Sequence, residues 1–346
     1  MRQYRVVAAL VLLWAVEARA DLTIDTVTVG NAGNVGEWSG ASYGGYGPDR
    51  LCGAVDYTYD IGRYEVSTAE YAKFLNAVAA TDTHDLYNPE MWSGIFGCKI
   101  ERTGTPGSYT YSVASEWANR PVNCISWGDA ARFSNWLHNG QPGGDQDLST
   151  TEDGSYFLDG ATSIAELMDV TRAPDATWVI PTEDEWYKAA YHRNDGVTGN
   201  FFDYPTSSDV VPSNDLADPD PGNNVNCYNR GLTISAPYFR TEVGEFENSQ
   251  SAYGTYDQGG NVWEWNEQKV NSTTRSVRGG AFYDGPDKLR ASVRLERAPT
   301  YELAAMGFRV ALVPEPATLA LLFAGGVTVF GGRRGTGRSG RSRSEP

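Results

Sequence analysis

The chain has 346 residues, of which 40% are hydrophobic and 12% aromatic. This apolar content is enough for a sizeable core and excludes a wholly disordered protein. The formal net charge of −16 and the pI near 4.6 argue against nucleic acid as a partner, because phosphate binding needs clustered lysine and arginine. The 38 glycines and 17 prolines predict many turns and loops.

Residues 1–20 have the three parts of a secretory signal peptide. Arg2 and Arg5 give a positive region, residues 6–16 an apolar stretch, and Ala18-Arg19-Ala20 a cleavage site with small residues. A transmembrane anchor is the alternative, but the apolar run is short for a membrane span. The sequence therefore predicts export.

The C-terminal segment, 313–346, also has three parts. Pro314-Glu315-Pro316 is followed by the apolar stretch 317–332 and then by arginines. This tail resembles the PEP-CTERM sorting signal of Gram-negative bacteria. The resemblance implies transient membrane anchoring through a short transmembrane segment, cleavage by an exosortase-type enzyme, and delivery to the cell surface or extracellular matrix. A plain C-terminal anchor is the alternative.

The two ends carry much of the positive charge. They hold eight of the 28 basic residues and three of the 44 acidic residues, so the part between them has a net charge of −21. Such a surface attracts cations and repels anionic polymers. Its carboxylates are the hard oxygen ligands that calcium prefers.

The middle of the chain predicts one irregular α+β domain over residues 51–312, after a lead-in at 21–50 with a strand or two. Three capping boxes, each opening an apolar run, predict short helices. The best strand candidates are short, and the acidic segments 141–154 and 204–229 read as loops. The capping pairs are Ser67 and Glu70, Ser126 and Asp129, and Thr182 and Glu185, and the strands are 178–180, 276–278 and 307–312.

After the first box, Tyr71, Phe74, Leu75 and Val78 recur at helical spacing, and they should face the core. Ala130, Phe133, Trp136 and Leu137 do the same after the second box, and Trp186, Ala189 and Ala190 after the third.

Several segments in this order resemble the formylglycine-generating enzyme, or sulfatase-modifying factor, family. The family fold is a single α+β domain with little regular structure, related to C-type lectin-like folds. The arginines and tryptophans of these segments are predicted to stabilise the fold rather than to take part in chemistry. The segments are GRYEVS at 62–67, RPV at 120–122, SWGDA at 126–130, IPTEDEW at 180–186, GGNVWEW at 259–265, RGG at 278–280 with Arg294, and GFR at 307–309.

The resemblance also implies a structural calcium site at a tight glycine loop. Asp257 and Glu264 would supply side chains, and Gly260 and Val262 their carbonyls. Carboxylates at both ends of such a loop suit calcium. Asn226 is the nearest candidate for a second family site, whose other residues are not recognisable.

Formylglycine-generating members of the family hold copper with two cysteines between the RGG and GFR motifs. Aligning Arg294 with the family arginine places Pro286 and Ala291 at those two positions. Neither side chain binds copper, so no copper is expected. The family's iron-dependent branch is also disfavoured, because the histidines are His84, His138 and His192, scattered along the chain.

The four cysteines are Cys52, Cys98, Cys124 and Cys227. In an exported chain this even number predicts up to two disulfides, with three possible connectivities.

Two functions stay open. The favoured one is a non-catalytic binding or structural module at the cell surface or in matrix, with a polysaccharide or peptide as ligand. Tyr283, Tyr301 and Trp117 are candidates for stacking on sugars. The alternative is a family enzyme, either a formylglycine-generating-type oxidoreductase or another, that uses non-cysteine residues in the same cleft, namely Asp284, Asp287, Arg290 and Arg294.

Overall fold

The computed structural model describes residues 22–40 and 49–314. The predicted signal peptide and the predicted transmembrane stretch at 317–332 lie outside these ranges. Of the helices in the described ranges, none is long and apolar enough to cross a membrane.

Three helices begin where the capping boxes predict, whereas the short helices at 90–93 and 115–118 have no side-chain cap and were not predicted. Ser67, Ser126 and Thr182 each accept from the backbone N–H three residues on, while the acidic residue there bonds back to the cap. A fourth box, at Ser163 and Glu166, was not predicted. The predicted apolar faces are buried. The helices are α1 (Thr68–Val78), α2 (Glu90–Ser93), α3 (Ser115–Ala118), α4 (Trp127–His138), α5 (Ile164–Asp169) and α6 (Glu183–Tyr191), with a 3-10 turn, η2, at Pro286–Leu289.

Two four-stranded sheets join distant parts of the chain. The first has the order β1-β4-β12-β7 and is antiparallel, so a strand ahead of residue 51 lies in the same sheet as the last strand. The second has the order β10-β9-β8-β11, with β11 parallel to β8. The strands are β1 (Thr26–Val29), β4 (Tyr59–Gly62), β12 (Ala311–Leu312), β7 (Trp178–Val179), β10 (Leu295–Arg297), β9 (Arg275–Arg278), β8 (Trp263–Lys269) and β11 (Met306–Gly307).

Two hairpins complete the strands, β2 (Glu37–Ser39) with β3 (Arg50–Cys52) and β5 (Ile100–Thr103) with β6 (Thr110–Val113). The predicted strands at 178–180 and 276–278 appear as β7 and β9. The predicted strand at 307–312 is two strands, because Gly307 pairs with Glu264 in the second sheet whereas Ala311 pairs with Ile61 and Val179 in the first.

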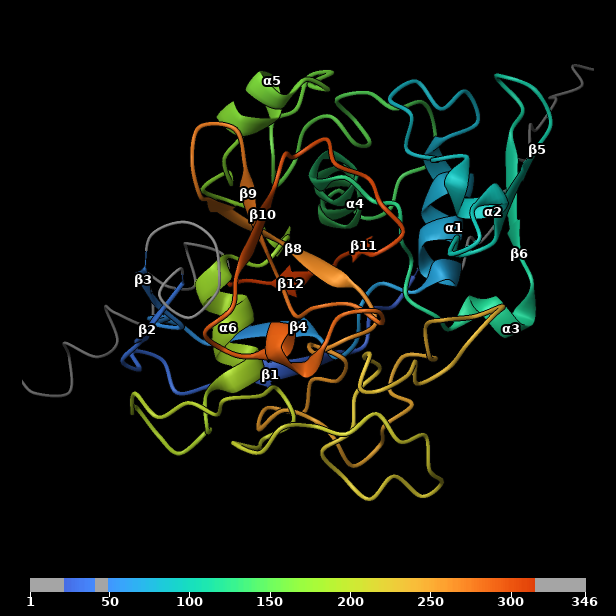
Figure 1. Ribbon diagram of the computed structural model, residues 1–346. Coiled ribbons are helices and arrows are strands. Elements are labelled where there is room, and N and C mark those ends of the chain that lie inside the picture. The colour runs from blue at the N-terminus through green and yellow to red at the C-terminus, as the bar shows by residue number, and fades with distance from the viewer. Residues whose placement is uncertain (1–21, 41–48, 315–346) are drawn as a thin grey trace, which may run out of the picture.

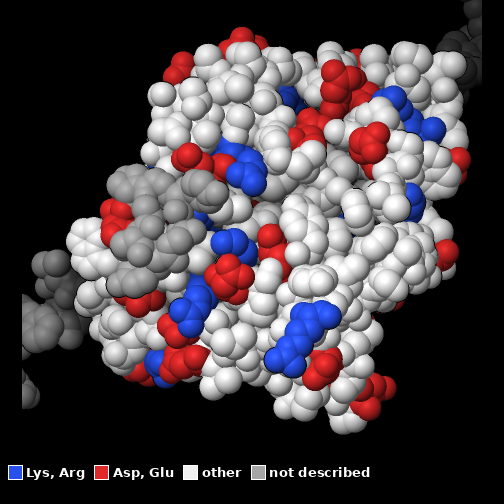
Figure 2. Space-filling view, viewed as in Figure 1, with Lys and Arg blue, Asp and Glu red and all other residues white. Residues whose placement is uncertain are grey.

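Loops occupy much of the molecule. Between α6 and β8 the described chain has no helix or named strand, and this long segment forms the lower part of the view in Figure 1. Aromatic rings fill the core between α1 and α4, where Phe74 lies 5.3 Å from both Phe133 and Trp136. The predicted loop-rich α+β fold is confirmed. On the face drawn in Figure 2, acidic and basic side chains lie close together among uncharged ones.

The predicted disulfides are absent: all four cysteines are free and buried. Cys52 packs with Trp186 and Ala291 in one apolar cluster, and Cys227 packs in another. Cys98 and Cys124 lie in the main core. In this structure the four cysteines therefore act as buried apolar side chains.

Candidate functional site

The glycine loop that precedes β8 brings a buried carboxylate against the GFR motif. Glu264 and Arg309 are both fully buried, and the guanidinium donates from Nε to Oε2 and from Nη2 to Oε1, each at 2.6 Å. Trp186 Nε1 donates to Glu264 Oε2 at 2.7 Å. Three family motifs therefore meet at one carboxylate.

Asp257 lies at the other end of the same loop, with a φ of 59°. Its Oδ2 accepts from Gly244 N at 2.6 Å. Burial raises the pKa of Asp257 to about 6, although the Gly244 N–H and the charge of Arg309 oppose this effect. The loop therefore holds a second carboxylate in a poorly solvated position.

Glu65, which belongs to the GRYEVS motif at 62–67, lies beside this pair. It is 2% exposed, and both of its carboxylate oxygens lack a hydrogen-bond partner. Burial raises its pKa well above the usual value, and the negative charges of Asp257 and Glu264 raise it further, against the opposing charge of Arg309. In the absence of a cation, the raised pKa therefore favours the protonated, neutral form of Glu65.

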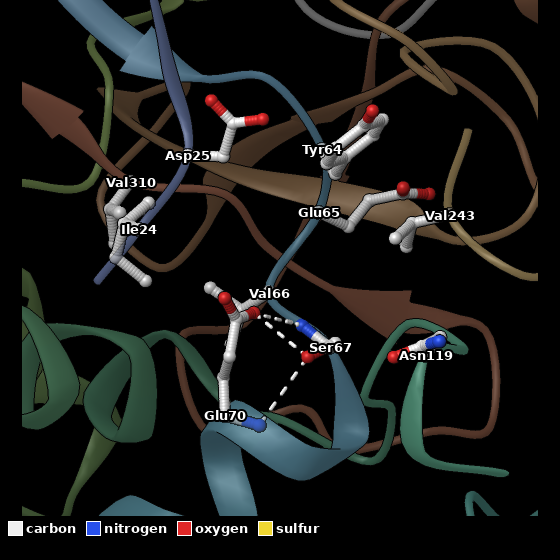
Figure 3. Close-up of a pocket in the computed structure, with 10 residues that line it drawn as sticks. All are labelled: Ile24, Asp25, Tyr64, Glu65, Val66, Ser67, Glu70, Asn119, Val243 and Val310. Atoms are coloured by element: carbon white, nitrogen blue, oxygen red, sulfur yellow. Dashed lines mark hydrogen bonds between the residues drawn. The ribbon is translucent and has the colours of Figure 1, made fainter. Parts of the chain in front are cut away.

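Figure 3 shows the cavity of about 140 Å³ that Glu65 lines. Glu70 is engaged in the capping box with Ser67, and Asp25 pairs with Arg63 at 2.8 Å. The side chain of Glu65 points toward Val243. Of the three carboxylates that line this cavity, Glu65 is therefore the unpartnered one.

Asn226, the candidate for a second calcium site, is buried. Its amide nitrogen donates to Asn261 Oδ1 at 2.7 Å and to the Phe239 carbonyl at 3.1 Å, while its Oδ1 has no hydrogen-bond partner. Asn226 Oδ1 is therefore free to accept a hydrogen bond or to bind a cation.

A second carboxylate hub joins the IPTEDEW and RGG motifs. Glu183, fully buried, accepts from Arg278 Nε at 2.7 Å and from Arg50 Nη1 at 2.8 Å. Arg294 Nη1 approaches it at 3.3 Å. Burial alone would raise the pKa of Glu183, but the three arginine charges outweigh it and lower the pKa to about 2. The Glu183 hub therefore joins separate segments of the fold, which is the structural role expected of the motif arginines.

Residues 286–291, which carry the family's copper positions and form the copper segment, follow β9 in the chain and contact it through Arg278. Pro286 begins the η2 turn, and Ala291 is 6% exposed, with its carbonyl accepting from Arg278 and Ser39. Cys52 packs in the same cluster as Ala291, and Cys227 packs against Leu289. Burial raises the pKa of Cys52 to about 11 and that of Cys227 to about 12, so both thiols are protonated at neutral pH.

The four residues considered for alternative catalysis do not form one group. Asp284 Oδ2 accepts from Trp263 Nε1 at 2.8 Å, and Arg294 belongs to the buried Glu183 hub. Asp287 is exposed and pairs with Lys288. Arg290 donates to Tyr204 at 2.9 Å on the surface.

Exposed rings lie next to the copper segment. Tyr283 is 48% exposed and packs edge-to-face on Phe282 at 5.0 Å, and Phe282 contacts Phe96, which is 36% exposed. Tyr301 is half-buried beneath the Arg297 guanidinium at 5.2 Å. We call Phe96, Tyr283 and Tyr301 the aromatic surface.

Trp117, the third stacking candidate, is not part of this surface. It is 7% exposed and packs on Tyr238 with ring centroids 5.0 Å apart. The prediction that it stacks on sugars is wrong, because α3 turns its ring into the protein. Phe96 was missed, since a single phenylalanine in a loop gives no periodic signal.

The fold and these motif contacts define a sulfatase-modifying factor type of domain. The chain belongs to this family: the family model described as a sulfatase-modifying factor enzyme 1-like domain matches residues 53–313. No curated protein matches the chain.

Solved structures agree on the fold. The chain resembles a structure titled Crystal Structure of CarF, with 18% identity and a TM-score of 0.51 over 85% of this chain and 99% of that one. It resembles Treponema denticola variable protein 1 with 17% identity and a TM-score of 0.51, over the same shares. PvdO from Pseudomonas aeruginosa has 18% identity and a TM-score of 0.46 over 86% and 100%.

The residues present fit calcium but not copper. A buried carboxyl group without a partner, next to two carboxylates, is stabilised either by protonation or by a bound cation. Within residues 22–40 and 49–314, no three histidine, cysteine, aspartate or glutamate side chains are grouped around one metal position. Calcium would therefore need backbone carbonyls as well. At the copper positions, proline and alanine offer no donor atom.

Proposed function

We propose that this protein is an exported, non-catalytic binding module that displays an aromatic surface for polysaccharide. The observation that supports this proposal most directly is that, in the copper segment, Pro286 and Ala291 occupy the two metal-binding positions of the family. The scaffold around that segment is intact, because the Glu183 hub still ties it to the rest of the domain.

Polysaccharide is the proposed ligand because of the chemistry beside this segment. Tyrosine and phenylalanine rings offer flat apolar faces on which sugar rings stack, and the tyrosine hydroxyl adds a polar edge. Tyr283 presents nearly half of its surface to solvent. Asp287 and Arg290, both exposed and close in sequence, supply hydrogen-bonding groups for sugar hydroxyls.

A glycan array with purified protein tests this proposal. Replacing Tyr283 with alanine should lower binding to the preferred glycan by about tenfold, since stacking on an aromatic ring contributes about 1 kcal/mol or more. Trp38→Ala is the matched control, because Trp38 is 68% exposed and lies in the separate β2–β3 hairpin. Equal losses in both variants, or binding only to peptides, would contradict the proposal.

We also propose that a structural calcium ion braces the loop before β8. Asp257 and Glu264 would supply carboxylates, and Gly260 and Val262 carbonyls, while Glu65 offsets the cation's charge from the segment between β4 and α1. Bound calcium would neutralise excess carboxylate charge and fix the loop. Glu264 would then be shared between the ion and Arg309.

Terbium luminescence tests the calcium site, because the Trp186 indole contacts Glu264 and can sensitise a bound lanthanide. Terbium should bind saturably and be displaced by calcium, and Glu65→Gln should weaken binding at least tenfold. Glu70→Gln is the matched control, since Glu70 lines the same cavity and glutamine preserves a capping box. Unchanged binding in Glu65→Gln would refute the role of Glu65.

The route to the surface is part of the proposal. The signal peptide supports export, and the Pro-Glu-Pro tail supports processing by an exosortase-type enzyme at the cell surface or in the matrix. Mass spectrometry of the protein from native cells should show loss of residues 1–20 and of the segment after Pro316. A protein that retains both ends would contradict this route.

A further inference from the structure

A second cavity carries two buried donors without partners. It has a volume of about 100 Å³ and lies between the start of α4, the end of β8 and the start of β9. Trp127 and Arg275 both line it, and neither the indole Nε1 of Trp127 nor the Nε of Arg275 has a hydrogen-bond partner. Trp127 is fully buried and Arg275 is 2% exposed.

The other two nitrogens of the Arg275 guanidinium have hydrogen-bond partners. Nη1 donates to the Glu267 carbonyl at 2.6 Å, and Nη2 donates to the Leu167 and Val170 carbonyls at 2.7 and 2.8 Å. The guanidinium lies 3.7 Å from the centroid of the Trp127 ring. The two residues with unpartnered N–H groups are therefore in direct contact at the wall of one cavity.

The charge around the cavity favours an anion. Arg172, Lys269 and Arg275 line it together with one carboxylate, Glu267. Glu267 already accepts from Arg172 at 2.8 Å and from the Tyr156 hydroxyl. Arg172 is also paired with the buried Glu185 at 2.9 Å, so Arg275 and Lys269 are the lining cations that form no ion pair with a carboxylate in the described part of the chain. Burial lowers the pKa of Arg275 to about 10, which leaves it charged at neutral pH.

From this geometry we infer that the cavity between Trp127 and Arg275 binds a small oxyanion, such as a sulfate, phosphate or carboxylate group. One or two anion oxygens accept from Trp127 Nε1–H and Arg275 Nε–H, and Lys269 at the rim supplies further positive charge. Two unsatisfied buried N–H groups are costly, and hydrogen bonds to a charged acceptor are the stronger kind. The volume corresponds to roughly three liquid waters, which is enough for such a group.

Nitrogen-15 labelling of the tryptophan indoles gives a direct readout. The Trp127 indole signal is identified by its loss in Trp127→Phe, and the Trp38 signal by its loss in Trp38→Phe. Purified protein is titrated with sodium sulfate, acetate, glucuronate and chloride at constant ionic strength. The Trp127 signal should shift saturably with the oxyanions while the Trp38 signal stays fixed. Acetate and glucuronate separate a free anion from a carboxylate carried by a sugar.

Two variants test the assignment further without loss of the reporter signal. Arg275→Lys keeps the charge but removes the Nε–H donor, and it should weaken binding about tenfold. Lys269→Gln should weaken binding by a smaller factor, because the rim charge is more solvated. A Trp127 signal that moves no more than that of Trp38, or that moves equally with chloride, would overturn the inference and leave the cavity to water.

Discussion

Replacing Glu183 with glutamine tests whether the buried carboxylate hub holds the copper segment in place. Glu183 is fully buried and accepts from Arg50, Arg278 and Arg294, which come from three separate parts of the chain. Glutamine has nearly the same shape but no charge. The substitution therefore leaves Arg278, which is fully buried, without its carboxylate.

The expected cost follows from the pKa of Glu183. A fall from 4.5 to about 2 corresponds to roughly 3 kcal/mol at 1.36 kcal/mol per pKa unit. Removing one partner of a buried ion pair costs about 3–5 kcal/mol in other proteins, which agrees. Domains of ordinary stability unfold with about 5–15 kcal/mol, so this loss is a large share of the total.

The pH dependence has a definite sign. Because the folded pKa of Glu183 lies below its unfolded value, its contribution to stability is fully present above pH 4.5. It is lost as the pH falls from 4.5 toward 2. The variant should therefore differ from the parent protein most at neutral pH and least near pH 2.

Urea unfolding followed by tryptophan fluorescence measures the effect. Glu183→Gln should lower the free energy of unfolding by about 3 kcal/mol at pH 7. Glu116→Gln is the control, because Glu116 is exposed and its loss should cost less than about 0.5 kcal/mol. A cost below about 1 kcal/mol for Glu183→Gln would show that the hub does not stabilise the fold.

Further predictions concern calcium, one glycine and the thiols. Chelation of calcium should lower the Tm by about 5 °C, since a ligand at 100 times its Kd adds about 2.7 kcal/mol, and an unchanged Tm in calorimetry would contradict the site. Gly260→Ala should unfold at lower urea by about 3 kcal/mol or more, because its φ is 91° and the new Cβ would lie 2.2 Å from the Asn226 carbonyl oxygen. A thiol reagent should react with none of the four cysteines in the native protein and with all four in denaturant. Fewer reactive thiols in denaturant would reveal a disulfide.

The sequence predicted the three longest helices, α1, α4 and α6, because their signals are local. A serine or threonine followed three residues later by an acid specifies a helix start, and apolar spacing specifies the buried face. The capping box at Ser163 and Glu166 follows the same sequence rule, so the helix after it could also be predicted from the sequence. Strand prediction was weaker, because β8 has no apolar residue after Trp265 and buries the polar residues Glu264 and Asn266.

The candidate site was only partly predictable for a related reason. The loop with Asp257 and Glu264 is contiguous, so its spacing is visible in the sequence. Glu65 joins it from a segment nearly 200 residues away, and nothing local indicates that both of its oxygens lack partners. The same holds for the cavity between Trp127 and Arg275, which come together only when α4 packs against β9. The failure of Trp117 shows that an aromatic residue in a short helix gives no sign of its exposure.

The most direct test of the central claim is a chemical one. Purified protein is loaded with Cu(I), with and without calcium, and incubated with oxygen, a reductant and a cysteine peptide of the sulfatase type. Mass spectrometry then follows the peptide beside an active control enzyme of the family. With Pro286 and Ala291 at the copper positions, we expect the cysteine to remain unconverted. Conversion of the cysteine to the aldehyde would contradict the account.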